Sequence, residues 1–437
     1  MSIVAIVGRP NVGKSTLFNR LVGRRMAIVS EVAGTTRDRV SASLGYRDRD
    51  FILVDTGGLA PGPSTDLEQG VLDQIHIAIE EATVIIVMVD ARDGLTAADL
   101  EVSDLLRRSG KPIVLAVNKV DNEKREADLP DFYRLGIGDP IPISAYHNIG
   151  LDQLMNRVAD HLPPSPPQDQ HEAMKIAIVG RPNVGKSMLL NAILGQDRVI
   201  VSESPGTTRD AVDTHFQYEG KPLLLIDTAG VRRRGHIEQG IERYSVLRTM
   251  QAIYRADVVL LIVDATELMT AQDLHIWGYT KDAFKGVVVV VNKWDLASDL
   301  DLTKKSTTPQ LRARLRAAQY VPILYVSAKD RQGIDKLIPT AQEIFEDRGK
   351  KVATSALNRV LIRAVASSPA PSTRGRKIKV FYATQTDVHP PTFTLFVNDP
   401  SLMHFSYQRY LENQLREAFG FRGTPLQLRF ERRSGER

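Results

Sequence analysis

The chain has 437 residues, of which 57 are basic and 52 acidic, and its formal net charge is +5. This length predicts about two to four domains, since domains commonly hold about 100–200 residues. The absence of cysteine excludes a disulfide scaffold, a thiolate metal site and a cysteine nucleophile. The longest apolar runs have five or six residues, whereas a membrane span needs about 20, and the start shows no secretory signal. We therefore expect a cytoplasmic protein that does not enter a membrane.

The charge is divided unequally along the chain. Residues 1–173 have a net charge of −7, residues 174–351 of +5, and residues 352–437 of +7. Such asymmetry predicts different partners for different parts of the chain. We expect the acidic first part to lie away from RNA and the basic C-terminal part to face it.

An internal repeat divides the first 350 residues into two copies. Five short motifs occur twice in the same order, with offsets of 172 to 183 residues. They are Gly8–Ser15 and Gly180–Ser187, Gly34–Asp38 and Gly206–Asp210, Asp55–Gly58 and Asp227–Gly230, Asn118–Asp121 and Asn292–Asp295, and Ser144–Ala145 and Ser327–Ala328. Each copy is too long for a solenoid unit, so the repeat predicts two tandem domains of the same fold.

Short apolar runs alternate with helix-length segments in each copy. In the first copy the runs are Ile3–Val7, Phe51–Val54, Ile85–Val89 and Ile113–Val117. Continuous apolar strands separated by helices are typical of a parallel sheet covered on both faces. We therefore predict two α/β domains with mostly parallel sheets, at residues 1–162 and 174–350.

The remaining segments have different patterns. Four prolines in five residues, within residues 163–173, predict a semi-rigid linker because they cannot continue a helix. After the second copy the predicted elements are a helix at Val352–Ala366, strands at Lys377–Ala383 and Thr392–Val397, a helix at Met403–Phe419 and a strand at Pro425–Phe430. This order predicts a small α+β domain at residues 351–437.

The first motif is a phosphate-binding loop that follows a predicted strand and opens a predicted helix in both copies. The pattern G-x-x-x-x-G-K-S points backbone N–H groups at phosphates, and the helix N-terminus adds partial positive charge. Lys14 and Lys186 should reach the β- and γ-phosphates, while Ser15 and Ser187 should bind Mg²⁺. The loops consist of Gly8, Arg9, Pro10, Asn11, Val12 and Gly13, and of Gly180, Arg181, Pro182, Asn183, Val184 and Gly185.

Two further motifs predict a magnesium site and a sensor of the γ-phosphate. Asp55 and Asp227 follow apolar strands, at the position of a carboxylate that holds Mg²⁺. Gly58 and Gly230 can donate an N–H to the γ-phosphate. Two adjacent threonines of each G-T-T-R-D motif compete to complete the metal shell, and the second is favoured. The favoured threonines are Thr36 and Thr208, and the other loop residues are Thr56, Gly57 and Leu59, and Thr228, Ala229 and Val231.

The N-K-x-D motif predicts that the base is guanine and not adenine. A carboxylate accepts hydrogen bonds from guanine N1–H and N2–H₂, and adenine has neither donor there. Asp121 and Asp295 should take this role. The preceding asparagine should tie the motif to the phosphate loop, the lysine stem should cover the base, and the S-A motif should offer an N–H to guanine O6. These supporting residues are Asn118, Lys119, Val120, Ser144 and Ala145, and Asn292, Lys293, Trp294, Ser327 and Ala328.

The usual catalytic glutamine is missing from both copies. Ras-type enzymes carry it directly after D-x-x-G to orient the attacking water, and here Leu59 and Val231 follow. Either hydrolysis is slow, or another group supplies this function. An RNA-binding scaffold that senses GTP and hardly hydrolyses it is therefore an alternative, as is a GTPase for tRNA modification or trafficking.

Together these motifs resemble those of the bacterial Der (EngA) GTPases, which have tandem G domains followed by a KH-like domain. The resemblance extends over essentially the whole chain. It implies a GTPase that binds GTP or GDP with Mg²⁺, acts in assembly of the large (50S) ribosomal subunit and contacts its rRNA. We also expect a monomer.

The resemblance also implies a role for a monovalent cation. In potassium-activated relatives a P-loop asparagine helps to bind K⁺, and Asn11 and Asn183 occupy that position; bracing of the loop is the alternative role. The catalytic set expected on this basis is Asn11, Lys14, Thr36 and Gly58 in the first copy, and Asn183, Lys186, Thr208 and Gly230 in the second.

Two local features need separate interpretation. Met188 follows Ser187 where the family usually has threonine, and we expect nucleotide binding to stay intact. Gly420–Gly423 reads G-F-R-G, which is either a backbone clamp on single-stranded RNA or the C-terminal cap of the preceding helix. Basic residues near Lys377 and near the chain's end favour RNA contact, with a solvated basic face as the alternative.

Overall fold

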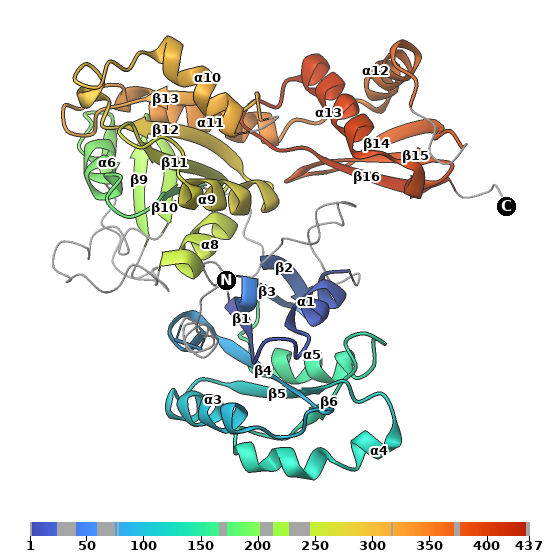
Figure 1. Cartoon of the computed structure of the whole chain (residues 1–437). Helices are drawn as coiled ribbons and strands as arrows, with labels where there is room; N and C mark the ends of the chain where they lie inside the picture. Colours follow the sequence, from blue (N-terminus) through green and yellow to red (C-terminus); the bar gives the residue numbers. More distant parts are fainter. Residues whose placement is uncertain are drawn as a thin grey trace. The chain divides into compact units, whose positions relative to one another are not determined.

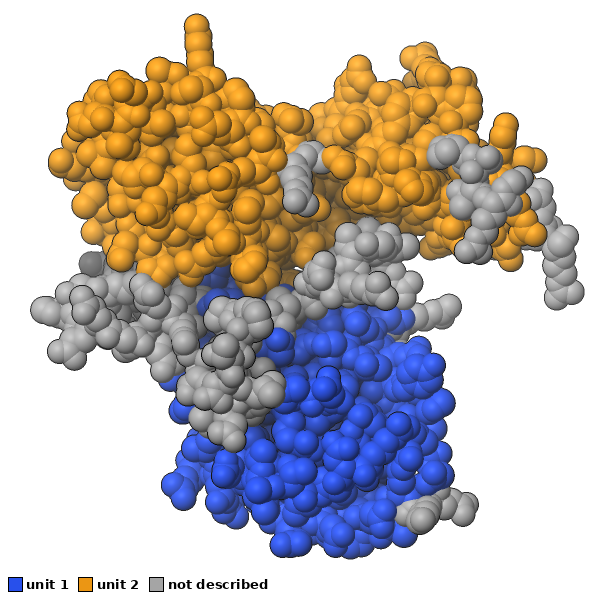
Figure 2. Space-filling model, in the orientation of Figure 1, with its two compact units in different colours: residues 1–169, 243–251 blue, residues 170–242, 252–437 orange. Residues whose placement is uncertain are grey.

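The computed structural model describes residues 2–23, 41–58, 75–76, 78–165, 173–201, 213–226, 245–315, 318–370 and 376–433. The chain forms two compact units, residues 1–169 with 243–251 and residues 170–242 with 252–437 (Figure 2), and each is described by itself. The second unit contains most of the second repeat copy and the C-terminal region. None of the described helices is long and apolar enough to cross a membrane.

The first repeat copy forms a six-stranded sheet in the spatial order β2-β3-β1-β4-β5-β6 (Figure 1). Its strands are β1 (Ser2–Val7), β2 (Ser41–Tyr46), β3 (Arg49–Asp55), β4 (Val84–Asp90), β5 (Ile113–Asn118) and β6 (Ile141–Pro142). Its helices are α1 (Lys14–Gly23), α3 (Ala97–Arg108), α4 (Glu123–Glu126) and α5 (Leu151–Asp160), with short 3₁₀ helices η1 (Thr56–Gly58) and η2 (Leu129–Leu135). The predicted parallel strands are confirmed.

Burial explains why these strands are almost wholly apolar. Alternate residues Val4, Ile6 and Ile86 pack with Phe18 of α1 and Leu154 of α5, and none of the five is more than 1% exposed. The residues between them in β1 and β4 are buried as well, so both faces of the central strands are covered. The polar motifs are therefore confined to the loops at the strand ends.

Strand β2 is an addition that the apolar runs do not predict, because Ser41–Tyr46 contains two serines and a glycine. It pairs antiparallel with β3 through a two-residue turn at Arg47 and Asp48, whose φ angles are +46° and +54°. Left-handed residues at both turn positions match the twist of a tight hairpin. The second copy repeats this turn at Glu219 and Gly220.

The second repeat copy has the same fold with one more strand, in the order β13-β12-β11-β7-β10-β9-β8. The strands are β7 (Met174–Val179), β8 (Val199–Val201), β9 (Thr214–Tyr218), β10 (Lys221–Ile226), β11 (Val258–Asp264), β12 (Gly286–Asn292) and β13 (Ile323–Tyr325). The helices are α6 (Lys186–Leu194), α8 (Ser245–Arg255), α9 (Ala271–Asp282), α10 (Lys304–Arg314), α11 (Leu337–Arg348), η5 (Trp294–Leu296) and η6 (Ile334–Lys336). Helices α6 and α11 pack on one face of the sheet, and α9, α10 and the last turn of α8, with Ala252 and Ile253, pack on the other.

The C-terminal region has the predicted α-β-β-α-β order. It consists of α12 (Thr354–Ser367), β14 (Val380–Val388), β15 (Pro391–Val397), η7 (Pro400–Leu402), α13 (Phe405–Phe419) and β16 (Gln427–Arg432). Strand β14 starts three residues later than predicted and continues through the polar residues 384–387, because backbone pairing with β15 extends it beyond the apolar alternation. Strand β16 pairs in parallel with β15, and α12 and α13 supply the apolar core.

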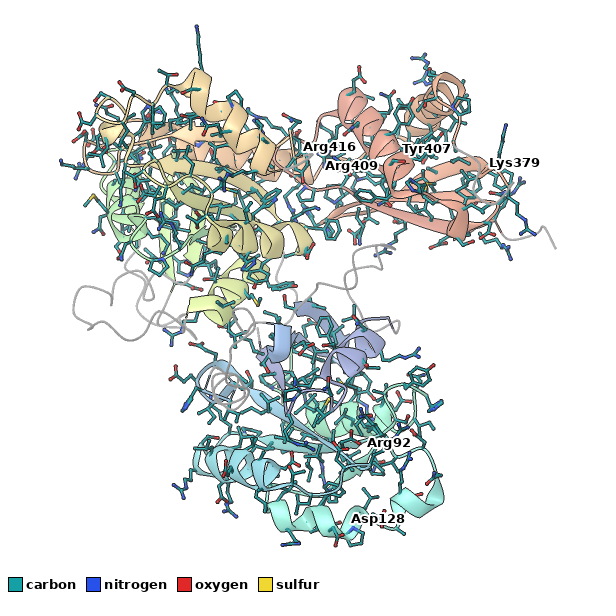
Figure 3. All side chains as sticks on the ribbon, in the orientation of Figure 1. Arg92, Asp128, Lys379, Tyr407, Arg409 and Arg416 are labelled. Carbon is teal, nitrogen blue, oxygen red and sulfur yellow. The ribbon has the colours of Figure 1, made fainter. Side chains whose placement is uncertain are left out.

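A glycine-containing turn after α13 packs against the second repeat copy. Helix α13 ends at Phe419 and is capped by Gly420, whose N–H donates to the Arg416 carbonyl, so the capping role of G-F-R-G is confirmed. The N–H of Gly423 donates to the carbonyl of Tyr320 at 2.8 Å, and its carbonyl accepts from the N–H of Val287 at 2.7 Å. The guanidinium of Arg416, a residue labelled in Figure 3, lies 3.6 Å from the centre of the Tyr320 ring. The N–H and the carbonyl of Gly423 thus both contact the second repeat copy. Neither group is therefore available to clamp RNA.

We expect Gly423→Ala to destabilise the second unit by about 2–4 kcal/mol, from left-handed strain and overpacking. Gly423 has a φ of +68°, and a Cβ there would lie 2.4 Å from Ile344 Cδ1 and 3.0 Å from the Val287 carbonyl. The matched control is Gly220→Ala, with a φ of +77° and no atom within 4 Å of its Cβ. Urea denaturation measures both variants, and an equal loss of stability would contradict the role of the contact.

Two candidate nucleotide sites

Each copy presents a phosphate loop between its first strand and first helix, with the loop lysine directed back over the loop. Lys14 Nζ donates to the carbonyl oxygens of Gly8 at 2.7 Å and Arg9 at 2.8 Å. Lys186 makes the same two contacts, at 2.8 and 2.6 Å. Burial lowers the pKa of Lys14, and the neighbouring Asp55 acts in the opposite direction. The Lys14 ammonium is buried and held by two carbonyl oxygens, and it is therefore well placed to attract phosphate oxygens.

One asparagine side chain ties the phosphate loop to the guanine motifs. Asn118 Nδ2 donates to the Val12 carbonyl at 2.7 Å, and Asn118 Oδ1 accepts from the Ala145 N–H at 3.0 Å. Asn292 repeats both contacts at 2.8 and 3.0 Å. Gly13 has a φ of +103°, and a Cβ there would lie 2.4 Å from Asn118 Nδ2. A larger residue at this position would therefore separate the two motifs.

The two carboxylates expected to read guanine are both oriented by a serine. Ser144 Oγ donates to Asp121 Oδ1 at 2.8 Å, and Ser327 Oγ donates to Asp295 Oδ1 at 2.7 Å. The hydrogen bond from Arg92 is the largest cause that holds the pKa of Asp121 below its usual value, followed among the lowering contacts by that from Ser144. Asp121 therefore acts as an ionised hydrogen-bond acceptor, as guanine recognition requires.

The motif lysines have a partner that the motif analysis does not identify. Lys119 forms an ion pair with Asp90 and donates to the Asn11 carbonyl at 3.1 Å. Lys293 forms the equivalent ion pair with Asp264 at 2.6 Å. These acids follow the apolar runs of β4 and β11 as a repeated Asp-Ala, 174 residues apart, and that recurrence is the signal that could have found them.

The first copy also brings together the oxygen atoms expected to hold magnesium. Ser15 Oγ donates to Asp55 Oδ2 at 2.6 Å, and Asp55 is only 2% exposed. The second carboxylate oxygen of Asp55 accepts from the Gly57 N–H at 3.1 Å. A hydroxyl and a carboxylate are hard oxygen ligands that suit Mg²⁺ when phosphate and water complete its shell. The donor set therefore fits the metal.

Several predicted site residues lie outside the described part of the chain. They are Thr36 and Leu59 in the first copy, and Thr208, Asp227, Thr228, Ala229, Gly230 and Val231 in the second. Within the described residues, the structure brings together the phosphate and guanine motifs of both copies and, of the expected metal ligands, Ser15 and Asp55 of the first copy. Thr56 and Gly58 lie in η1, and Trp294 packs on Tyr325 with ring centres 4.4 Å apart.

A phosphate loop joined through asparagine to N-K-x-D and S-A motifs defines a P-loop GTPase, and this chain contains the arrangement twice. A family model described as "50S ribosome-binding GTPase" matches residues 3–119 and 175–293. A second, described as "KH-domain-like of EngA bacterial GTPase enzymes, C-terminal", matches residues 351–431.

Whole-length relatives agree with these matches. GTPase Der of Geobacillus thermodenitrificans (strain NG80-2) is 52% identical over 427 residues, which cover 98% of each chain. GTPase Der of Caldanaerobacter subterraneus subsp. tengcongensis is 49% identical over 433 residues, which cover 99% of each chain. The chain therefore belongs to the Der family of GTPases, as the resemblance predicts. Membership makes it a GTP-binding GTPase and implies GTP, GDP and Mg²⁺ as ligands.

We expect Asp295→Asn to abolish tight guanine binding at the second site. The amide cannot accept from both N1–H and N2–H₂, and losing two charge-assisted hydrogen bonds should weaken GDP binding about a hundredfold or more. Xanthine has a carbonyl in place of the 2-amino group, so XDP should bind better than GDP. Calorimetry should show one tight GDP site in place of two. The control is Asp299→Asn, an exposed acid on the same loop, and two tight GDP sites in Asp295→Asn would contradict the assignment.

Proposed function

We propose that this protein is a slow, K⁺-stimulated GTPase that acts in assembly of the large (50S) ribosomal subunit. The observation that carries the GTPase part is the duplicated guanine framework, in which Asn118 and Asn292 hold the motifs of Asp121 and Asp295 against the phosphate loops. The ribosomal part is supported by the description of the matching family model and by the basic C-terminal region.

Each predicted residue has a proposed role in nucleotide binding. Lys14 and Lys186 contact the β- and γ-phosphates, and Gly58 and Gly230 report the γ-phosphate through their N–H groups. The remaining loop residues shape the cradle for phosphate and base. The proposed Mg²⁺ ligands are Ser15, Thr36 and Asp55 in the first copy, and Ser187, Thr208 and Asp227 in the second.

A K⁺ ion beside the phosphates is the proposed substitute for the missing glutamine. Asn11 and Asn183 both have left-handed backbones, with φ of +66° and +63°, and both side chains are exposed. Within the described part of the chain neither side chain makes a hydrogen bond, which favours a ligand role over bracing. A cation there would offset charge that develops on the transferred phosphoryl group.

The proposed domain division is residues 1–162, 163–173, 174–350 and 351–437, for the first G domain, the linker, the second G domain and the KH-like domain. The family matches at residues 3–119, 175–293 and 351–431 fall inside these limits. We propose that the basic last domain and the second G domain contact rRNA, with the acidic first domain away from it. A monomeric state and a cytoplasmic location belong to the same proposal.

A second candidate function is a GTP-sensing RNA scaffold with little hydrolysis. It is favoured by Leu59 and Val231, whose side chains cannot orient water. This candidate shares the nucleotide sites and the RNA contacts, and differs only in turnover. Kinetics therefore separate the two.

We expect single-turnover GTP hydrolysis to be at least about tenfold faster in KCl than in NaCl, because K⁺ supplies electrostatic stabilisation at the phosphates. Asn11→Ala and Asn183→Ala should each reduce this difference, and the double variant should remove it. The control is Asn191→Ala, an exposed asparagine of α6. Equal, undetectable rates in both salts would favour the scaffold.

We expect the protein to co-sediment with large ribosomal subunits, and more strongly with a non-hydrolysable GTP analogue than with GDP. Charge neutralisation by the basic C-terminal domain should make this binding weaker as salt rises. Isolated small subunits are the control. Absence from the large-subunit fraction in both nucleotide states would remove the assembly role.

A further inference from the structure

The guanine-reading carboxylate of the first copy has three hydrogen-bond partners. Asp121 Oδ1 accepts from Ser144 Oγ at 2.8 Å. Asp121 Oδ2 accepts from Arg92 Nη2 at 2.8 Å and from Arg125 Nη1 at 2.8 Å. Both arginine contacts are ion pairs, and the Asp121 side chain is 19% exposed. The carboxylate expected to bind guanine is thus already in contact with two cations, both on Oδ2.

The carboxylate of the second copy contacts no arginine of the described residues. Among the residues that the structure describes, Asp295 accepts only from Ser327 Oγ, at 2.7 Å. The position of Arg92 is taken by Thr266, since each donates its N–H at 2.9 Å to the acid that ends the preceding strand. Thr266 Oγ1 also donates a hydrogen bond to that acid, Asp264, at 2.8 Å.

The second arginine also has no counterpart. The 174-residue offset that relates N-K-x-D in the two copies places Asp299 where the first copy has Arg125. The two sites therefore share their framework and differ in the charge that surrounds the base-reading acid. Because both sites belong to one chain, the charges around Asp121 and Asp295 can be compared directly.

Counting acceptor positions shows the consequence for guanine. An ionised carboxylate offers about four lone-pair positions, and guanine N1–H and N2–H₂ need two of them. Three are taken at Asp121, which leaves about one, whereas Asp295 keeps about three. One arginine must therefore leave the Asp121 carboxylate before guanine can form both of its hydrogen bonds there. Asp295 requires no such step.

Of the two arginines on Asp121, Arg92 makes fewer contacts. Its side chain, which is labelled in Figure 3, is 54% exposed. Within the described part of the chain its guanidinium contacts Asp121 alone. Arg125 is 28% exposed and its Nη1 also donates to the Lys119 carbonyl at 3.0 Å. Release of Arg92 breaks one contact, while release of Arg125 breaks two.

We propose that Arg92 lowers the affinity of the first nucleotide site for guanine nucleotides, because it occupies Asp121 until guanine displaces it. The inference rests on the proposed guanine role of Asp121. A base that offers both donors replaces the lost hydrogen bond, and a base such as adenine leaves Arg92 in place. Because an exposed ion pair contributes little, we expect Arg92 to weaken GDP binding at this site by about three- to fivefold.

The test uses the full chain with Asp295→Asn, so that GDP binds tightly at the first site only. Arg92→Thr copies the residue of the second site, and Arg92→Gln removes the charge while keeping most of the stem. The matched control is Arg157→Thr, which removes an ion pair with Asp139 of 2.8 Å from an arginine that is 48% exposed. The probe is methylanthraniloyl-GDP, followed at equilibrium and by stopped flow.

Both Arg92 variants should bind the probe about three- to fivefold more tightly and associate with it faster at low salt. The gain should fall below about twofold in 1 M NaCl, where the Debye length is about 3 Å. Unchanged or weaker binding in either variant, or an equal gain in Arg157→Thr, would overturn the role of Arg92. Loss of GDP binding in the Asp295→Asn parent would instead overturn the guanine role of Asp121, so the two failures are distinguishable.

Discussion

The carboxamide of Asn118, with that of Asn292, is the contact on which each nucleotide site depends. Its N–H₂ group donates to the Val12 carbonyl of the phosphate loop, and its oxygen accepts from the Ala145 N–H of the S-A motif. Three loops from distant parts of the sequence thus become one surface. Because the amide is buried, its two hydrogen bonds cannot be replaced by water, and losing either leaves an unsatisfied polar group.

In the second copy, the strand that leads to Asn292 also contacts the C-terminal domain at its opposite end. Strand β12 ends at Asn292 and begins beside Val287, whose N–H is held by the turn at Gly423. The nucleotide motifs of the second G domain therefore lie at one edge of its sheet, and the KH-like domain contacts the opposite edge.

The two copies show how one framework is adapted by its charges. Distances in the asparagine and serine contacts agree within about 0.1 Å between copies. The surroundings of the base-reading acids do not agree, because Arg92 and Arg125 in the first copy correspond to Thr266 and Asp299 in the second. The backbone framework is thus the same in the two copies, and the charges around the base-reading acids differ.

Local sequence determined the class of this protein, since the phosphate loop, N-K-x-D and parallel-sheet strands depend on backbone and hydrogen-bonding chemistry that a few adjacent residues contain. It did not predict β2, the extent of β14, the ion pair of Lys119 with Asp90, or the docking of Gly423. Each of these needs a partner remote in sequence, and no local pattern specifies it. Whether Arg92 contacts Asp121, 29 residues away, was likewise decided only when β4 and β5 were brought side by side in the sheet.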